Sequence, residues 1–134
     1  MTINFIAVIV AGAAGWCISA LWYSPYLFAK QWSEIMGSTW KEATGRFTPM
    51  QAMAIEGGLT LITAYVIAIV VDALNIHGPL MAMRVGFWLW LGFQVTTLYS
   101  SVLFERRPLQ LFYINAGARL VSTLVMALVI GLWP

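Results

Sequence analysis

Charge is what this sequence has least of. Asp, Glu, Lys and Arg together make up 9% of the 134 residues, whereas soluble domains carry about 25%. Apolar residue types make up 61%, against about 45–50% in soluble domains. A chain of this size cannot bury so much apolar surface in water, so the composition predicts lipid as the solvent. The net charge of +2 is too small to indicate a nucleic-acid partner, and no long basic cluster changes this, so we expect none.

Cysteine is almost absent as well. Cys17 stands alone, which excludes an internal disulfide and any metal site built only of cysteines. The sequence also lacks a zinc-binding H-E-x-x-H motif and a glycine-rich phosphate loop before a helix. We therefore expect no catalytic residues, no metal ligands and no cofactor, and we expect that the chain is not an enzyme.

What the sequence does contain is four long apolar segments, at about residues 3–23, 50–73, 81–104 and 109–133. A helix that spans a bilayer needs roughly 20 apolar residues, whereas membrane β-strands alternate over about ten. The pattern predicts an all-α integral membrane protein whose four transmembrane helices form one domain over residues 1–134. No basic residue precedes Lys30 and no A-x-A cleavage site follows the first segment, so we interpret it as a retained helix and not a signal peptide.

The connections between these segments also carry signals. Ser24-Pro25 indicates a corner, and residues 26–36 have helical spacing with one apolar side, which predicts a short helix in the membrane interface. Thr48-Pro49 is typical of a helix start, and residues 75–79 predict a tight turn. The connection at residues 105–108 is so short that the third and fourth segments must be antiparallel neighbours.

Basic residues predict the orientation of the chain. The two loops on one side contain Lys30, Lys41, Arg46, Arg106 and Arg107, whereas the opposite side has only Arg84. The positive-inside rule places both charged loops in the cytoplasm and both termini outside. We therefore expect a multi-pass protein of the bacterial inner (plasma) membrane, with membrane lipids as partners.

Two stretches of the sequence indicate an internal repeat. Residues 23–30 (Y-S-P-Y-L-F-A-K) align with residues 99–106 (Y-S-S-V-L-F-E-R), and apolar positions of the second segment align with those of the fourth. We interpret the chain as two copies of a helical hairpin, related by an axis along the membrane normal.

The repeat brings a set of polar residues into correspondence. They share one face of the second segment or one face of the fourth by helical spacing, and they are Glu56, Thr60, Thr63, Asn115, Arg119 and Ser122. A two-fold axis would direct both faces toward the middle of the bundle. The sequence thus predicts an intramembrane polar site with an acid from one half and a base from the other.

Glu56 and Arg119 are candidates for an ion pair. At a rise of about 1.5 Å per residue, they lie roughly 9 Å and 15 Å from the cytoplasmic ends of their helices, which an arginine side chain can bridge. Charges at such depth usually pair or line a wet cavity. The pair could be a static one that fixes helix register, or part of an anion or proton site. Arg119 could instead extend toward the cytoplasm or pair across an oligomer interface.

Small residues repeat every four positions along the first segment, at Ala7, Ala11, Gly15 and Ser19. Small residues at this spacing let helix backbones approach closely in lipid. We predict a helix-packing seam, either within one chain or between chains.

Several motifs resemble a known family. They are L-W-Y-S-P-Y-L-F-A-K-Q-W at residues 21–32, W-L-G-F at 90–93 and L-F-E-R-R-P-L-Q-L-F-Y-I-N-A-G at 103–117. On these residues, the chain resembles the bacterial membrane family called domain of unknown function 1761. The resemblance implies a small four-helix membrane protein and implies no catalytic residue.

Four short helices enclose little volume, so a path through the membrane would need several copies of the chain. The leading functional hypothesis is a homo-oligomeric transporter or channel for a small solute or ion that uses Glu56, Asn115 and Arg119. The alternative is a non-enzymatic accessory or scaffold subunit that binds a membrane-protein partner, or a lipid-binding protein.

Overall fold

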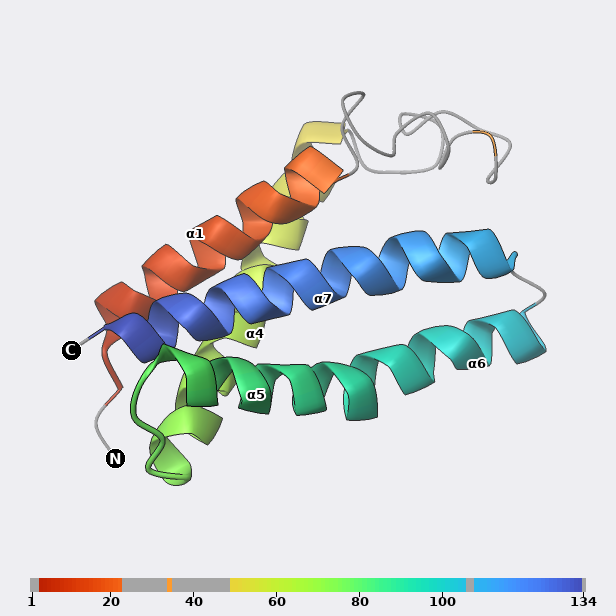
Figure 1. Ribbon diagram of the computed structural model, residues 1–134. Coiled ribbons are helices and arrows are strands. Elements are labelled where there is room, and N and C mark those ends of the chain that lie inside the picture. Colours follow the sequence, from red (N-terminus) through yellow and green to blue (C-terminus); the bar gives the residue numbers. More distant parts are fainter. Residues whose placement is uncertain (1–2, 23–33, 35–48, 106–107, 134) are drawn as a thin grey trace.

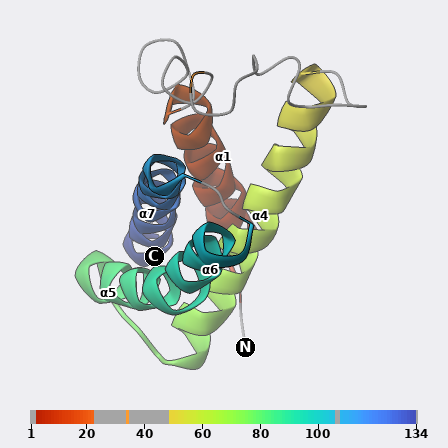
Figure 2. The same cartoon turned by 90° about the vertical axis from the view of Figure 1, so that its right-hand side faces the viewer.

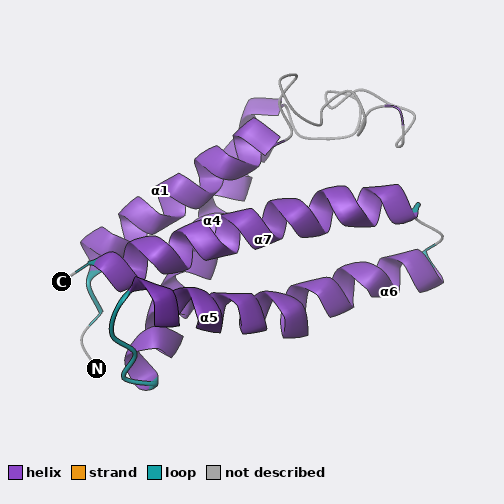
Figure 3. Ribbon diagram, viewed as in Figure 1, coloured by secondary structure: helices purple, strands orange, loops and turns teal. Residues whose placement is uncertain are grey.

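The described part of the chain is helical throughout. The computed structural model describes residues 3–22, 34, 49–105 and 108–133, and no strand occurs in these ranges. The elements are α1 (Phe5–Trp22), α4 (Pro49–Ala73), α5 (Pro79–Leu89), the π-helix η1 (Trp90–Val95), α6 (Thr96–Phe104) and α7 (Leu109–Leu132) (Figures 1 and 3). α5, η1 and α6 follow one another without a break, so together they form one long helix.

Four of these helices are long and apolar enough to cross a membrane, namely α1, α4, the continuous α5–η1–α6 helix and α7. This confirms the predicted all-α fold and four helices that are able to span a membrane, and the observed ends differ from the predicted ones by no more than two residues. The predicted interfacial helix at residues 26–36 and the predicted cap Thr48 lie outside the described residues, apart from Glu34.

The helix ends have identifiable local causes. Asn4 Oδ1 accepts hydrogen bonds from the backbone N–H groups of Ile6 and Ala7, at 3.0 and 3.2 Å, and so caps the start of α1. At the end of α4, Asn75 adopts a positive φ of 55°. Its N–H donates to the Asp72 carbonyl and that of Ile76 donates to the Val71 carbonyl, both at 3.0 Å. This Schellman arrangement ends α4 and begins the predicted tight turn.

The turn then leads directly into α5. Gly78 has a φ of 93°, a conformation that residues with a Cβ rarely adopt. Pro79 is the first residue of α5, where its fixed φ suits a helix and its missing N–H costs nothing.

The π-helix is a feature that the sequence pattern did not predict. Helices with this wider turn are rare and often mark functional sites. The hydroxyls of Thr96 and Thr97 donate to the carbonyls of Gly92 and Phe93 within the π-helical segment, each at 2.8 Å. The side-chain oxygen of Gln94 is buried and has no hydrogen-bond partner among the described residues.

α7 lies at the centre of the bundle and contacts each of the other helices. α1 lies along one side of α7, the α5–α6 helix runs antiparallel along another, and α4 passes behind in the view of Figure 1 (Figures 1 and 2). α4 meets α5 over a short stretch only, and the start of α4 lies well apart from the end of α6 (Figure 1). By contrast, α1 contacts α7 along much of its length. A two-fold repeat would make the α1–α7 and α5–α4 contacts equivalent, so the two halves pack unequally and the repeat stays a prediction.

Small residues bring these helices together. The four residues of the predicted seam, Ala7, Ala11, Gly15 and Ser19, are all buried within a single chain. A Cβ on Gly15 would lie 2.8 Å from Met126 Sδ in α7, and one on Gly12 would lie 3.2 Å from Leu61 Cα in α4. α1 thus approaches both neighbours through glycine, as expected for helices packed in lipid.

The outward surface is apolar. Large hydrophobic side chains such as Phe5, Ile62, Trp88, Phe93 and Leu103 are exposed on the outside of the bundle. A soluble monomer rarely exposes contiguous apolar surface of this kind. Together with the four spans, this surface makes the chain a multi-pass membrane protein.

Candidate functional site

Glu56 and Arg119 lie side by side in the bundle. Arg119 Nη1 in α7 is 3.2 Å from Glu56 Oε1 in α4, which makes a charge-assisted hydrogen bond and an ion pair. α4 begins where α1 ends and α7 begins where α6 ends in the chain, so both run from the same side of the bundle and residues at similar depth can meet. The structure thus brings together the acid and the base that the repeat predicted on two different helices.

The pair is not enclosed by the chain that makes it. The side chain of Arg119 is 47% exposed and that of Glu56 is 27% exposed. Both residues lie inside helices long enough to span the membrane, where lipid is a poor solvent for charge. The guanidinium group carries five N–H donors, and one of its nitrogens contacts Glu56.

The hydroxyl groups predicted beside this pair are used elsewhere. Thr60 and Thr63 donate to the carbonyls of Glu56 and Leu59 in their own helix, at 2.8 and 3.1 Å, a common use of hydroxyls within a helix. The Ser122 hydroxyl is buried and donates to the Gly15 carbonyl at 3.3 Å. Ser122 therefore belongs to the seam between α1 and α7, where its hydroxyl hydrogen bond holds the two helices together.

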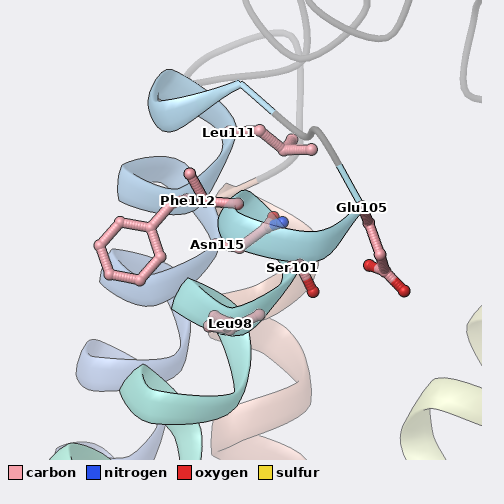
Figure 4. A pocket seen from close by; sticks show the side chains of 7 residues that line it. Leu98, Ser101, Glu105, Leu111, Phe112 and Asn115 are labelled. Carbon is pink, nitrogen blue, oxygen red and sulfur yellow. The ribbon is translucent and has the colours of Figure 1, made fainter.

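Asn115 lines a cavity of about 140 Å³ between α6 and α7. The cavity lies at the end of α6 and the start of α7, and its lining consists of Leu98, Ser101, Val102, Glu105, Leu111, Phe112 and Asn115. Figure 4 shows the side chains of Ser101 and Glu105 on the same side, away from the Phe112 ring. Because Asn115 precedes Arg119 by four residues, both lie on one face of α7.

Three indole N–H groups tie the helices together, and the sequence did not reveal them. Trp16 in α1 donates to the Met53 carbonyl in α4 at 3.0 Å. Trp22 in α1 and Trp90 in η1 donate to α7, to the carbonyls of Ile114 and Ala116, at 3.0 and 2.9 Å. In lipid there is no water to accept a hydrogen bond from an indole N–H group. Each of these bonds supplies the acceptor that the indole needs.

Trp22 and Trp90 bind the same turn of α7 from two sides. Directly after the second acceptor, a Cβ on Gly117 would lie 3.0 Å from the Trp22 ring. These residues belong to the motifs around residues 21–32, 90–93 and 103–117, so described residues of all three motifs meet in the structure. Residues 6–131 match the family described as Protein of unknown function (DUF1761).

The chain belongs to this family. The match covers nearly the whole chain and confirms the resemblance inferred from the motifs. No curated protein and no solved structure matches the chain. The DUF1761 family carries no described activity, so any function must be argued from the geometry of the residues themselves.

The indole hydrogen bonds of Trp22 and Trp90 lead to a first testable prediction. Replacing Trp22 or Trp90 with phenylalanine keeps an aromatic ring but leaves a carbonyl of α7 without its indole donor. We expect each variant to lose about 1 kcal/mol of unfolding free energy, the usual contribution of one hydrogen bond. Trp88→Phe is the matched control because Trp88 is 66% exposed. Equal stabilities of all three variants in a denaturant titration in bicelles would contradict a role for these bonds.

Proposed function

We propose that the chain is one subunit of a homo-oligomeric membrane channel or transporter for a small solute or ion, with Glu56 and Arg119 as its intramembrane polar site. The observation that carries the proposal is the exposure of this ion pair on a single chain, 47% for Arg119 and 27% for Glu56. A charge that faces hydrocarbon costs at least about 2.5–3.5 kcal/mol. The exposed side of the pair must therefore meet water or further protein.

Polar groups continue from the pair toward the charged corner. Asn115 is on the same face of α7 as Arg119, and it lines the cavity that also contains Ser101 and Glu105. Glu105 directly follows the last residue of α6, so it lies at the end of a span. These residues mark a polar route from one end of the bundle to Arg119, which is what a water-filled entrance to the site requires.

An anion is the substrate class that this geometry supports best. The guanidinium of Arg119 is more exposed than the Glu56 carboxylate, so it is the charge that a solute would meet. Its remaining N–H donors can bind a small anion, while Glu56 balances the charge when no anion is present. If the hairpin repeat holds, each half contributes one member of the pair.

The cellular setting is part of the proposal. The bias of Lys and Arg toward two loops supports a cytoplasmic position for the charged corners and an outside position for both termini. Together with the resemblance to a bacterial family, this supports the bacterial inner membrane. The polar entrance lined by Asn115 and Glu105 would then open to the cytoplasm.

A flux measurement tests this function. We expect proteoliposomes that contain the wild-type chain to pass chloride or nitrate faster than protein-free vesicles, as monitored with an entrapped anion-sensitive dye. Arg119→Gln removes the cation and should lower the flux at least tenfold. Glu56→Gln/Arg119→Gln, which removes both charges and leaves none unpaired, should be equally inactive.

Arg84→Gln is the matched control for that experiment, because it makes the same change in an exposed arginine near the start of α5. It should keep the flux within twofold of wild type. Wild-type flux no faster than that of protein-free vesicles would overturn the transport proposal. It would favour an accessory subunit in which the ion pair only fixes the packing of α4 on α7.

A further inference from the structure

A second cavity, of about 190 Å³, lies at the opposite end of the bundle, where α1 begins and α4 and α7 end. Figure 1 shows the start of α1 and the end of α7 together at this end. The polar members of its lining are Asn4, Asp72, His77 and Trp133. Ile76 and Ile130 belong to its apolar lining. An engineered cavity of about 150 Å³ binds benzene, so this one has room for a small organic molecule.

Asp72 brings a carboxylate to this cavity, and none of the described residues forms an ion pair with it. Arg84, the basic residue of the neighbouring helix, contacts Met81 Sδ at 3.8 Å instead. Over residues 3–22, 49–105 and 108–133, no basic side chain forms an ion pair with Asp72. An unpaired carboxylate beside apolar side chains favours a cationic ligand.

The helix ends reinforce that preference. The cavity includes the last turns of α4 and α7, and the C-terminal end of a helix carries roughly half a negative charge. The side-chain oxygen of Asn4 already accepts two backbone N–H groups of α1, so Asn4 serves the start of that helix. The charge that remains for a ligand is that of Asp72, supplemented by two helix dipoles.

The remaining lining suits the organic part of such a ligand. Trp133 offers an indole ring, whose face attracts ammonium groups. Ile76 and Ile130 supply apolar contacts. A bare metal ion fits this lining poorly, because no group of three His, Cys, Asp or Glu side chains with metal-binding geometry occurs among the described residues.

We propose that this cavity binds a small organic ammonium ion, with its nitrogen against the Asp72 carboxylate and its carbon atoms against Trp133 and the isoleucines. This site is independent of the anion route proposed above, because the two lie at opposite ends of the spans. The ammonium can come from a free amine or from the ethanolamine headgroup of a lipid, since both present the same chemistry.

Calorimetry on the purified full chain in detergent tests the site. The probe is ethanolammonium chloride, and ethylene glycol serves as its uncharged counterpart of similar shape. We expect saturable binding of the ammonium and none of the glycol. Asp72→Asn, which preserves size and hydrogen bonding, should weaken binding at least tenfold. Glu105→Gln removes a carboxylate at the other end of the bundle and should leave binding within twofold of wild type.

Native mass spectrometry then distinguishes the two sources. Retention of phosphatidylethanolamine over phosphatidylglycerol by the wild type, and loss of this preference in Asp72→Asn, would identify a lipid headgroup. Binding of ethanolammonium without a lipid preference would identify a free amine. Wild-type protein that binds no ethanolammonium, or an Asp72→Asn variant with unchanged melting temperature that binds it as well as wild type, would overturn the proposal.

Discussion

Glu56→Gln and Arg119→Gln are each expected to lower the unfolding free energy by roughly 2 kcal/mol, and the double variant by less than either single change. Removing one partner of a buried ion pair costs about 3–5 kcal/mol, because the other charge is left uncompensated. The partial exposure of this pair reduces that cost. Removing both charges leaves two neutral amides that can still bond to each other, so most of the loss is recovered.

Denaturant unfolding of the four proteins in bicelles measures this double-mutant cycle. Arg84→Gln is a useful control, because it makes the same change as Arg119→Gln at an exposed position. Its effect should stay within about 0.5 kcal/mol, as is usual at exposed positions. If the effects of Glu56→Gln and Arg119→Gln simply add, the two charges are not coupled and the ion pair contributes nothing to the bundle.

Gly131→Ala should destabilise the bundle by about 2 kcal/mol, although alanine usually favours a helix. An added Cβ would lie 2.8 Å from Ala82 Cβ, 2.8 Å from Pro79 Cα and 2.9 Å from the Gly78 carbonyl oxygen. Two of these three atoms belong to the backbone and cannot move by a side-chain rotation. α7 would have to shift away from the start of α5, and overpacking of this kind costs about 1–3 kcal/mol.

Gly58→Ala makes the same change where there is space. A Cβ at Gly58 in α4 would meet nothing within 4 Å, so the substitution should leave the unfolding free energy unchanged or raise it by about 0.5–1 kcal/mol through helix propensity. Both variants can be compared with wild type in one thermal or denaturant titration. A Gly131→Ala protein as stable as Gly58→Ala would mean that α5 and α7 do not approach as closely as described.

The helices could be predicted because each signal is local. Long apolar segments fixed the four spans, and Pro49, Pro79 and residues 75–78 marked where helices begin and end. The meeting of Glu56 with Arg119 was predicted from the repeat and from depth, because two helices that start at the same membrane surface place residues of similar depth near each other. Helical spacing then indicated which face of each of the two helices carries the polar residues.

The side-chain partners that could not be predicted from the sequence depend on how the helices pack against one another. Arg119 and Ser122 are three residues apart and were placed on one face, yet Arg119 reaches α4 while Ser122 bonds to Gly15 in α1. Only the position of α1 against α7 separates them. The same holds for the indole bonds of Trp22 and Trp90, and for η1, whose widened turn has no pattern in the sequence that distinguishes it from an ordinary helix.

The central place of α7 has a consequence for the order in which the protein assembles. α7 is made after the other three spans, and yet α5 packs mainly on it and α1 packs on it about as much as on α4. Before its synthesis, α1 and α4 can pair, but the α5–α6 helix has only a short contact with α4. Insertion into the membrane can therefore proceed helix by helix, whereas the tertiary structure closes only when the last helix enters between its neighbours.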